Sequence, residues 1–166
     1  FGDEGGIARS GGVITALASL PSGSDGADQI TGGVDSDYIF GGGRGDTING
    51  DDPVGGFAGA PNPGTAGDDV IIGDQGFIVF ADIVTGKIAS VATTDASAAD
   101  GDVDNLDGNG GDDIILGGVA GDSIKGGSGR DYLIGDQGAI VFSNGLPATV
   151  YSTDASAALG GNDTIA

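Results

Sequence analysis

Cysteine, histidine, methionine and tryptophan are absent from the 166 residues, and lysine and arginine together supply only 5. Without cysteine the chain forms no disulfide bonds. The sequence also lacks a G-x-S-x-G motif and contains a single glutamate, so most of the usual nucleophiles and general bases are missing. We therefore expect no enzymatic activity and no catalytic residues.

A long apolar segment is missing as well. No stretch of 18 consecutive apolar residues occurs, so the sequence predicts no membrane insertion. The first residues lack the basic and apolar regions of a signal peptide, and we expect any export signal to lie elsewhere. The formal net charge of −20 argues against nucleic acid and anionic lipid as partners. Cations are the partners that such a charge favours.

Aspartate and glycine dominate what is present. Of the 25 acidic residues 24 are aspartate, and glycine supplies 37 residues. Self-repulsion and the backbone entropy of glycine would keep such a chain unfolded unless bound cations cancelled the charge. Aspartate suits turns and the close approach of a carboxylate to a metal held against the backbone. The composition thus predicts metal ligands and folding that is coupled to cation binding.

A nine-residue period runs from Gly108 to Gly138. Asp113, Asp122 and Asp131 take the sixth place of three successive blocks, and an apolar residue follows each of them two places later. Nine residues fit neither a helix nor a long strand, so each block is predicted to be a turn followed by a short strand. Further blocks begin at Gly23, Gly32, Gly41 and Gly64, and the final GGNDTIA places Asp163 in the acidic position.

A longer repeat contains these blocks. The tetrapeptide GDQG begins at Gly73 and again at Gly135, 62 residues later, and FGDEG at residues 1–5 is a variant of it. Each copy is followed by a β-rich arm, a polar segment and nine-residue blocks, which predicts three repeat units. Unit one would span residues 1–72, with an arm at 7–20, blocks at 23–50 and 64–72, and a loop at 51–63. Unit two would span residues 73–134, with an arm at 77–93, an acidic loop at 95–107 and blocks at 108–134. Residues 135–166 would form a partial unit three.

The arms are predicted to be two-stranded hairpins. In the third arm Asn144 and Gly145 separate two apolar runs, and both residues tolerate the positive φ of a tight turn. Two interpretations remain open: the arms are extra strands that cap the coil, or they contact a neighbouring unit or molecule through exposed edges. The final DTIA followed by FGDEG is close to the internal DVIIGDQG, which suggests neighbouring copies in tandem or assembled end to end.

The block GGSGRDYLI from Gly126 resembles the repeat of the RTX (repeats in toxin) family, G-G-x-G-x-D-x-U-x with U a large apolar residue. The resemblance implies an all-β fold: calcium-loaded parallel β-roll (β-helix or solenoid) segments with interspersed hairpin arms. It also implies several Ca2+ ions, each held between stacked turns by carbonyl and carboxylate oxygens. Asp28 would share a side with Asp46, and Asp113 with Asp131.

The resemblance assigns metal ligands to the sixth-place aspartates and to carbonyls of the turn glycines. Three blocks have Asp35, Arg44 or Ala120 in place of the fourth-place glycine, which makes the sites on those turns less certain. The GDQG aspartates either add a carboxylate to the last site of a run or serve only the turn. The expected ligands are Asp28, Asp37, Asp46, Asp69, Asp74, Asp113, Asp122, Asp131, Asp136 and Asp163, with carbonyls of Gly108, Gly111, Gly126, Gly127 and Gly129.

Two other motifs carry less weight. Residues 100–113 are dense in aspartate but place Asn105 and Gly111 where an EF-hand loop needs glycine and glutamate, which leaves either an irregular calcium site or a solvated loop. The tripeptide Arg44-Gly45-Asp46 resembles a receptor-binding motif, but Asp46 already has a metal-ligand position. We expect a calcium-binding structural segment of a secreted, extracellular or cell-surface bacterial protein, such as an adhesin stalk or fibre. The alternative is an RTX secretion or folding module of an exported toxin or hydrolase.

Overall fold

The computed structural model describes residues 1–20, 25–51, 67–82, 84–95, 98–99, 101–154 and 159–166. These residues form fifteen strands in three sheets and contain no helix, so the fold is all-β, as predicted. No helix of the described ranges therefore has the length and hydrophobicity to cross a bilayer. The predicted loop 51–63 lies outside the described residues except for Asp51, as do the first residues of the blocks at Gly23 and Gly64.

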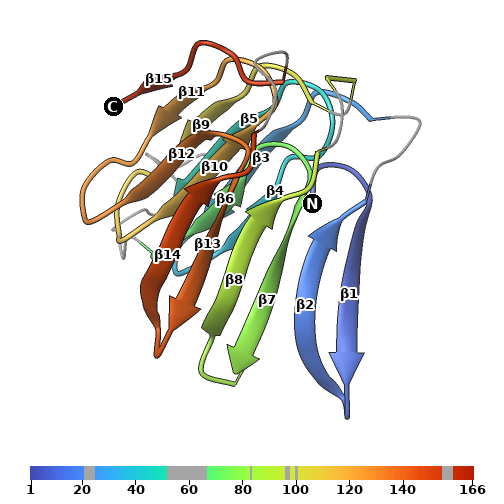
Figure 1. Cartoon of the computed structure of the whole chain (residues 1–166), viewed down its shortest axis with the longest axis vertical. Helices are drawn as coiled ribbons and strands as arrows, with labels where there is room; N and C mark the ends of the chain where they lie inside the picture. The colour runs from blue at the N-terminus through green and yellow to red at the C-terminus, as the bar shows by residue number, and fades with distance from the viewer. Residues whose placement is uncertain (21–24, 52–66, 83, 96–97, 100, 155–158) are drawn as a thin grey trace, which may run out of the picture.

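The three arms form one antiparallel sheet of six strands, here called the arm sheet (Figure 1). Each arm is a hairpin, and Asn144 and Gly145 have the positive φ values, 56° and 81°, that their turn was expected to need. The arms also pair with each other, because β2 is hydrogen-bonded to β7 and β8 to β13. The strands are β1 (Gly5–Ser10), β2 (Val13–Ser19), β7 (Gly76–Asp82), β8 (Lys87–Thr93), β13 (Gly138–Ser143) and β14 (Leu146–Ser152).

The nine-residue blocks form two parallel sheets, and successive blocks alternate between them. The sheet with the order β12-β10-β6-β4 is called the middle sheet, and the sheet with the order β15-β11-β9-β5-β3 the outer sheet. The middle sheet contains β4 (Tyr38–Phe40), β6 (Val70–Ile72), β10 (Ile114–Gly118) and β12 (Tyr132–Asp136). The outer sheet contains β3 (Gln29–Gly33), β5 (Thr47–Asp51), β9 (Asn105–Asp107), β11 (Ser123–Lys125) and β15 (Thr164–Ile165).

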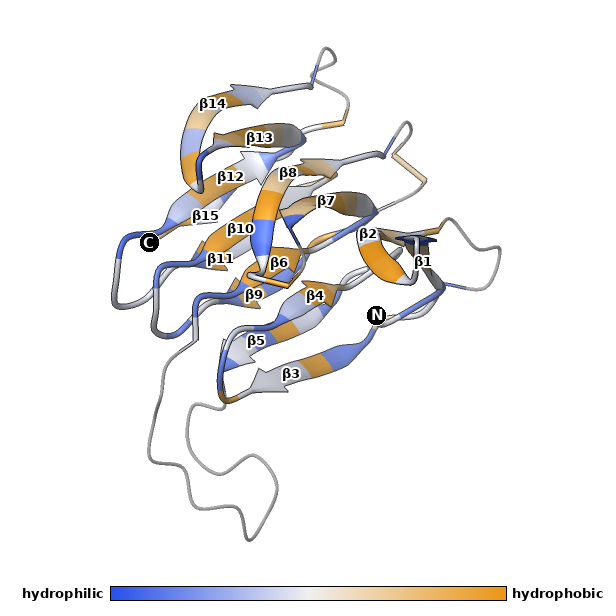
Figure 2. Ribbon diagram, turned by 90° about the horizontal axis from the view of Figure 1, so that it is seen from below, coloured by the Kyte–Doolittle hydropathy of each residue, from blue (hydrophilic) through white to orange (hydrophobic). Residues whose placement is uncertain are grey.

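The middle sheet lies between the other two, and both of its faces are buried (Figure 2). The central residue of each short strand, such as Ile71 or Ile115, packs against the outer sheet. The residues on either side of it, such as Ile72 and Leu116, pack against the inward row of the arm sheet that includes Ile78. Side chains alternate between the faces of a strand, so a strand buried on both faces must be apolar throughout.

The arms have two kinds of contact: they cover the middle sheet, and they pair with one another. They cover the coil, because Ile78, Val91 and Ile140 are fully buried against the middle sheet. They also contact one another, because Ile78 lies opposite Leu17 and Val91 lies opposite Ile140 in the strand register. The apolar core is consequently a double layer rather than one residue per block.

Two segments differ from their predicted places. Residues 95–107, expected to be an acidic loop, end in strand β9, because Leu106 supplies a central apolar residue and is fully buried between Ile48 and Ile124. The final Thr164–Ile165 pairs with β11 in the outer sheet. The internal VII of DVIIGDQG instead forms β6 of the middle sheet. The final DTIA therefore resembles the internal DVII in sequence, but the two segments belong to different sheets.

Candidate metal centre

Five aspartates that precede the strands of the outer sheet form a hydrogen-bonded row, here called the outer ladder. In each step the backbone N–H of one aspartate donates to Oδ1 of the aspartate in the next turn, which fixes one carboxylate oxygen of each acceptor. The distances are 2.7 Å from Asp28 N to Asp46, 2.7 Å from Asp46 N to Asp104, 2.9 Å from Asp104 N to Asp122 and 2.9 Å from Asp122 N to Asp163.

Four aspartates that precede the strands of the middle sheet form a second row, the middle ladder. The same bond links Asp37 N to Asp69 Oδ1 at 2.8 Å, Asp69 N to Asp113 Oδ1 at 2.9 Å and Asp113 N to Asp131 Oδ1 at 3.0 Å. The expected sharing of sides is present, because Asp28 lies beside Asp46 and Asp113 beside Asp131. The two ladders thus lie at the turns that lead into the strands of the two parallel sheets.

The second carboxylate oxygen of these aspartates is buried without a hydrogen bond. Among the described residues, Oδ2 has no hydrogen-bond partner in seven ladder aspartates, although buried polar atoms are nearly always paired. A carboxylate oxygen held in this way requires a proton or a cation to compensate its lost solvation. The seven are Asp28, Asp37, Asp46, Asp69, Asp104, Asp113 and Asp122.

Glycine keeps open the space in front of each Oδ2 atom. A Cβ built on Gly41 would overlap both Asp46 Oδ2 and the carbonyl oxygen of Gly73. A Cβ built on Gly108 would overlap Asp113 Oδ2 and lie 2.7 Å from the carbonyl oxygen of Gly126. Carboxylate and carbonyl oxygens therefore converge on points that only a glycine leaves free.

This donor set fits calcium. Calcium takes six to eight oxygen ligands, carboxylate or carbonyl, in flexible geometry. Within the described ranges no three acidic side chains converge as a group, so a site there would combine one or two carboxylates with backbone carbonyls. Soft metals that prefer thiolate or imidazole find neither here, because the chain has no cysteine or histidine.

The electrostatics of the ladders favour the binding of a cation. Burial, partly opposed by a backbone hydrogen bond and reinforced by neighbouring carboxylates such as Asp122, raises the pKa of Asp104 to about 8. Burial likewise raises the pKa of Asp69 and of Asp122 to about 7, and of Asp46 and Asp113 to about 6. Each ladder thus resists carrying its full negative charge in the absence of a cation.

The RTX calcium-binding nonapeptide repeat family matches the chain in four copies, at residues 22–52, 64–77, 98–119 and 107–139, which together cover just over half of it. The chain belongs to the RTX calcium-binding nonapeptide repeat family. RTX repeats bind calcium, several ions per array, and occur in exported bacterial proteins. The cofactor of this chain is therefore Ca2+, as predicted. No curated protein and no solved structure gives a significant match.

The GDQG aspartates of this RTX chain lie beside the ladders. Asp74 is fully buried, and its Oδ2 accepts a 2.6 Å hydrogen bond from Val119 N, which is a turn role. Its Oδ1 has no hydrogen-bond partner in the described part of the chain, so a ligand role stays open for that oxygen. Asp136 Oδ1 accepts a 3.2 Å bond from Gly161 N. Both aspartates thus have a turn role in the structure, and their metal-ligand role stays a prediction.

The predicted glycine ligands line the same turns. Gly108 and Gly126 face the middle ladder directly, as described above. The other three have positive φ, which permits the tight turn: 118° at Gly111, 103° at Gly127 and 140° at Gly129. A Cβ on Gly129 would overlap the carbonyl oxygen of Gly111, so these turns stack closely.

The fourth-place substitutions keep the turn conformation. Asp35, Arg44 and Ala120 have φ of 68°, 78° and 78°, which costs a non-glycine residue about 1–2 kcal/mol. The turns therefore retain their shape at some cost in stability.

One ladder residue, Asp104, was not among the predicted ligands. It is 1% exposed and forms the central step of the outer ladder. Its signal was in the sequence: extending the nine-residue frame back from Gly108 puts Asp104 in the sixth place and Leu106 in the eighth. The density of aspartates around it obscured that frame.

Proposed function

We propose that the chain is a calcium-loaded β-roll that folds on calcium binding and serves as a structural segment of a secreted or cell-surface bacterial protein, such as an adhesin stalk or extracellular fibre. The observation that supports this most directly is the pair of ladders, in which buried carboxylate oxygens face glycine-lined gaps. The strands alternate between two sheets held through these turns, so ions in the ladders would stabilise the whole coil.

The protein's own cations do not compensate the ladders. Two ion pairs occur among the described residues, Lys125 with Asp107 at 3.5 Å and Arg130 with Asp112, and neither includes a ladder residue. With 5 basic and 25 acidic side chains, most of the negative charge must be met from solution.

The repeat organisation supports a role in extension. We propose units 1–72 and 73–134 with a partial unit 135–166, each adding an arm and further turns to the same three sheets. Both ends of the array carry an edge strand in every sheet: β1, β3 and β4 at one end, β14, β15 and β12 at the other. Such edges favour pairing with a neighbouring copy, in tandem or by end-to-end assembly.

The alternative function is an RTX module that assists secretion or folding of an attached toxin or hydrolase. The occurrence of RTX repeats in exported proteins is consistent with both proposals. The arms favour the structural role, because their continuous sheet adds stiffness that the nine-residue blocks alone do not supply. We propose no catalytic role.

Circular dichroism in chelator and then in millimolar calcium tests the proposal. We expect little β structure without calcium, because the buried carboxylates repel one another, and a strong β signal once calcium is added. An unchanged β signal in chelator would contradict calcium-driven folding.

Electron microscopy of the same two samples tests end-to-end assembly. Filaments or short stacks are expected in calcium and single particles in chelator. Single particles in both samples would count against assembly while leaving calcium-driven folding intact.

A further inference from the structure

Acidic side chains gather at the base of the second arm, where β8 returns to the coil. Asp74 lies in the turn that leads into β7, and Asp95 follows the end of β8. Gln75 N donates a 3.1 Å hydrogen bond to Asp95 Oδ1, which holds the Asp95 carboxylate beside the turn that contains Asp74. Asp95 is 6% exposed and precedes the first residue of the matched repeat, residue 98.

Asp74 points into this cluster. It is fully buried, and a Cβ built on Gly101 would overlap both of its carboxylate oxygens, so the carboxylate faces the segment that follows the arm. Its Oδ1 has no hydrogen-bond partner within the described ranges. A fully buried carboxylate with an unpaired oxygen beside a second carboxylate is unfavourable unless a proton or a shared cation compensates the charge.

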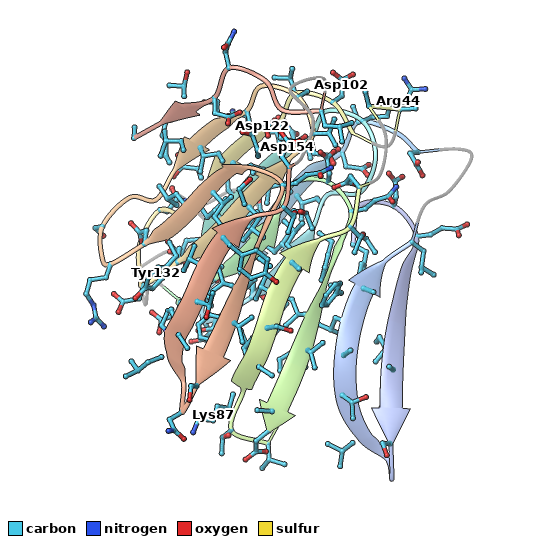
Figure 3. All side chains as sticks on the ribbon, viewed as in Figure 1. Arg44, Lys87, Asp102, Asp122, Tyr132 and Asp154 are labelled. Atoms are coloured by element: carbon cyan, nitrogen blue, oxygen red, sulfur yellow. The ribbon has the colours of Figure 1, made fainter. Side chains whose placement is uncertain are left out.

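The third arm brings together a corresponding pair of carboxylates, although both are only partly buried and Asp136 Oδ1 accepts a hydrogen bond from Gly161 N. A Cβ built on Gly160 would lie 2.5 Å from Asp136 Oδ1 and 2.9 Å from Asp154 Oδ2, so oxygens of these two carboxylates converge on one glycine. Asp136 takes the place of Asp74, and Asp154 the place of Asp95. Figure 3 shows Asp154 at the same end of the molecule as Asp122 of the outer ladder, away from Lys87 at the tip of an arm.

The base of each arm is built in the same way. The residue that follows the arm donates its backbone N–H to the third residue of the GDQG-type turn: Leu20 to Glu4, Thr94 to Gln75 and Thr153 to Gln137, at 2.8–2.9 Å. The next residue is aspartate in the second and third arms but Pro21 in the first. Only two of the three arms therefore have the second carboxylate.

We propose that calcium binds between Asp74 and Asp95, and again between Asp136 and Asp154, at sites that adjoin the outer ladder and add to the ions of the two ladders. Backbone carbonyls and water complete each shell. These ions tie the returning strand of an arm to the turn from which the arm began, so the arm sheet is fastened to the coil by metal as well as by apolar contact. The inference rests on the proposed calcium loading.

Counting bound ions by native mass spectrometry of the full chain in saturating calcium tests the proposal. Asp95→Asn removes one negative charge but keeps an oxygen that accepts from Gln75 N. Asp82→Asn is the matched control at the exposed tip of the same arm, where Oδ1 accepts from Val84 N at 3.0 Å. We expect one ion fewer in Asp95→Asn, one fewer in Asp154→Asn, two fewer in the double variant and no change in Asp82→Asn.

Hydrogen exchange adds an independent readout. Loss of the clamp is expected to raise exchange in β7 and β8 of Asp95→Asn while the ladder turns stay protected. An unchanged ion count in a folded Asp95→Asn or Asp154→Asn would overturn the proposal. A wild-type chain that binds no calcium would instead contradict the proposed function itself. If Asp95→Asn fails to fold, Asp154→Asn at the end of the array decides the question.

Discussion

The middle and outer sheets follow the same nine-residue period but differ in what flanks the central residue. The middle strands read YIF, VII, IIL and YLI, whereas the outer strands read QIT, TIN, NLD and SIK. In the middle sheet the flanking Phe40, Ile72 and Leu116 are fully buried beneath the arms. The nine-residue period therefore indicates where the ladder aspartates lie. The residues that flank the central apolar residue indicate which of the two sheets the arms cover.

The largest effect on stability is expected at Asp104, which forms the central step of the outer ladder. Asp104→Ala deletes a buried carboxylate from the middle of the outer ladder and leaves Asp46 N without its acceptor. By analogy with breaking a buried ion pair, it should cost about 3–5 kcal/mol of unfolding free energy in saturating calcium. Urea unfolding would measure this loss.

Two control variants separate the roles of Asp104. Asp104→Asn, which keeps the acceptor for Asp46 N, should cost less than Asp104→Ala. The exposed Asp102→Asn in the same segment should stay within about 0.5 kcal/mol of wild type. Equal stability of Asp104→Ala and Asp102→Asn would contradict the ladder.

The second prediction compares the stability cost of alanine at equivalent positions of two consecutive strands, β10 of the middle sheet and β11 of the outer sheet. Leu116→Ala removes a fully buried side chain beneath the arms and should cost about 2–5 kcal/mol. Lys125→Ala, nine residues later in the outer sheet, deletes an exposed side chain with one weak ion pair and should change stability by less than about 1 kcal/mol. Similar losses in the two variants, measured by urea unfolding in calcium, would show that the arms do not cover the middle sheet.

The third prediction concerns pH and acts on both ladders. Burial raises the pKa of Asp69 and Asp122 to about 7 and of Asp104 to about 8 in the ion-free fold, above the value of 3.8 for an unperturbed aspartate. A raised pKa means that the folded state binds these protons more tightly than the unfolded state. Without calcium the stabilisation is therefore complete below about pH 4 and is lost as the pH rises through 7 to 8.

Calcium binding should show the opposite trend. Protons compete with calcium for the ladder carboxylates, so the apparent affinity should increase from pH 5 to pH 8 and then level off. Calorimetric calcium titrations at several pH values would measure it, with exposed Asp82→Asn at the tip of the second arm as a variant that leaves the trend unchanged. An affinity independent of pH across this range would contradict ladder binding.

The smallest effect is expected on the outside of the turns. Arg130 forms an exposed ion pair with Asp112 and lowers the pKa of that carboxyl group, and it lies opposite no ladder oxygen. Arg130→Gln should leave the thermal midpoint in calcium nearly unchanged, because exposed ion pairs are screened by solvent. A fall in the thermal midpoint as large as that of Leu116→Ala would show that this exposed ion pair stabilises the fold, although it lies outside the ladders and the core.

The sequence was sufficient to predict the period, the hairpins and the sides on which the aspartates lie, because each depends on local spacing. Asp113 and Asp131 are two blocks apart, and two blocks make one turn, so their contact followed directly. The burial of Leu116 did not follow, because it depends on arms that are remote in the chain and pair only in three dimensions. Asp104 stood at the correct spacing, but the acidic residues on both sides of it hid the frame.

The central claim is that calcium in the two ladders holds the sheets together. The most direct test is one calcium titration in which far-ultraviolet circular dichroism and the number of bound ions are measured on the same samples. We expect the β signal to rise cooperatively and in step with ion binding, since a ladder lies at the turns of each parallel sheet. A β signal that is complete before the first ions bind would contradict this claim.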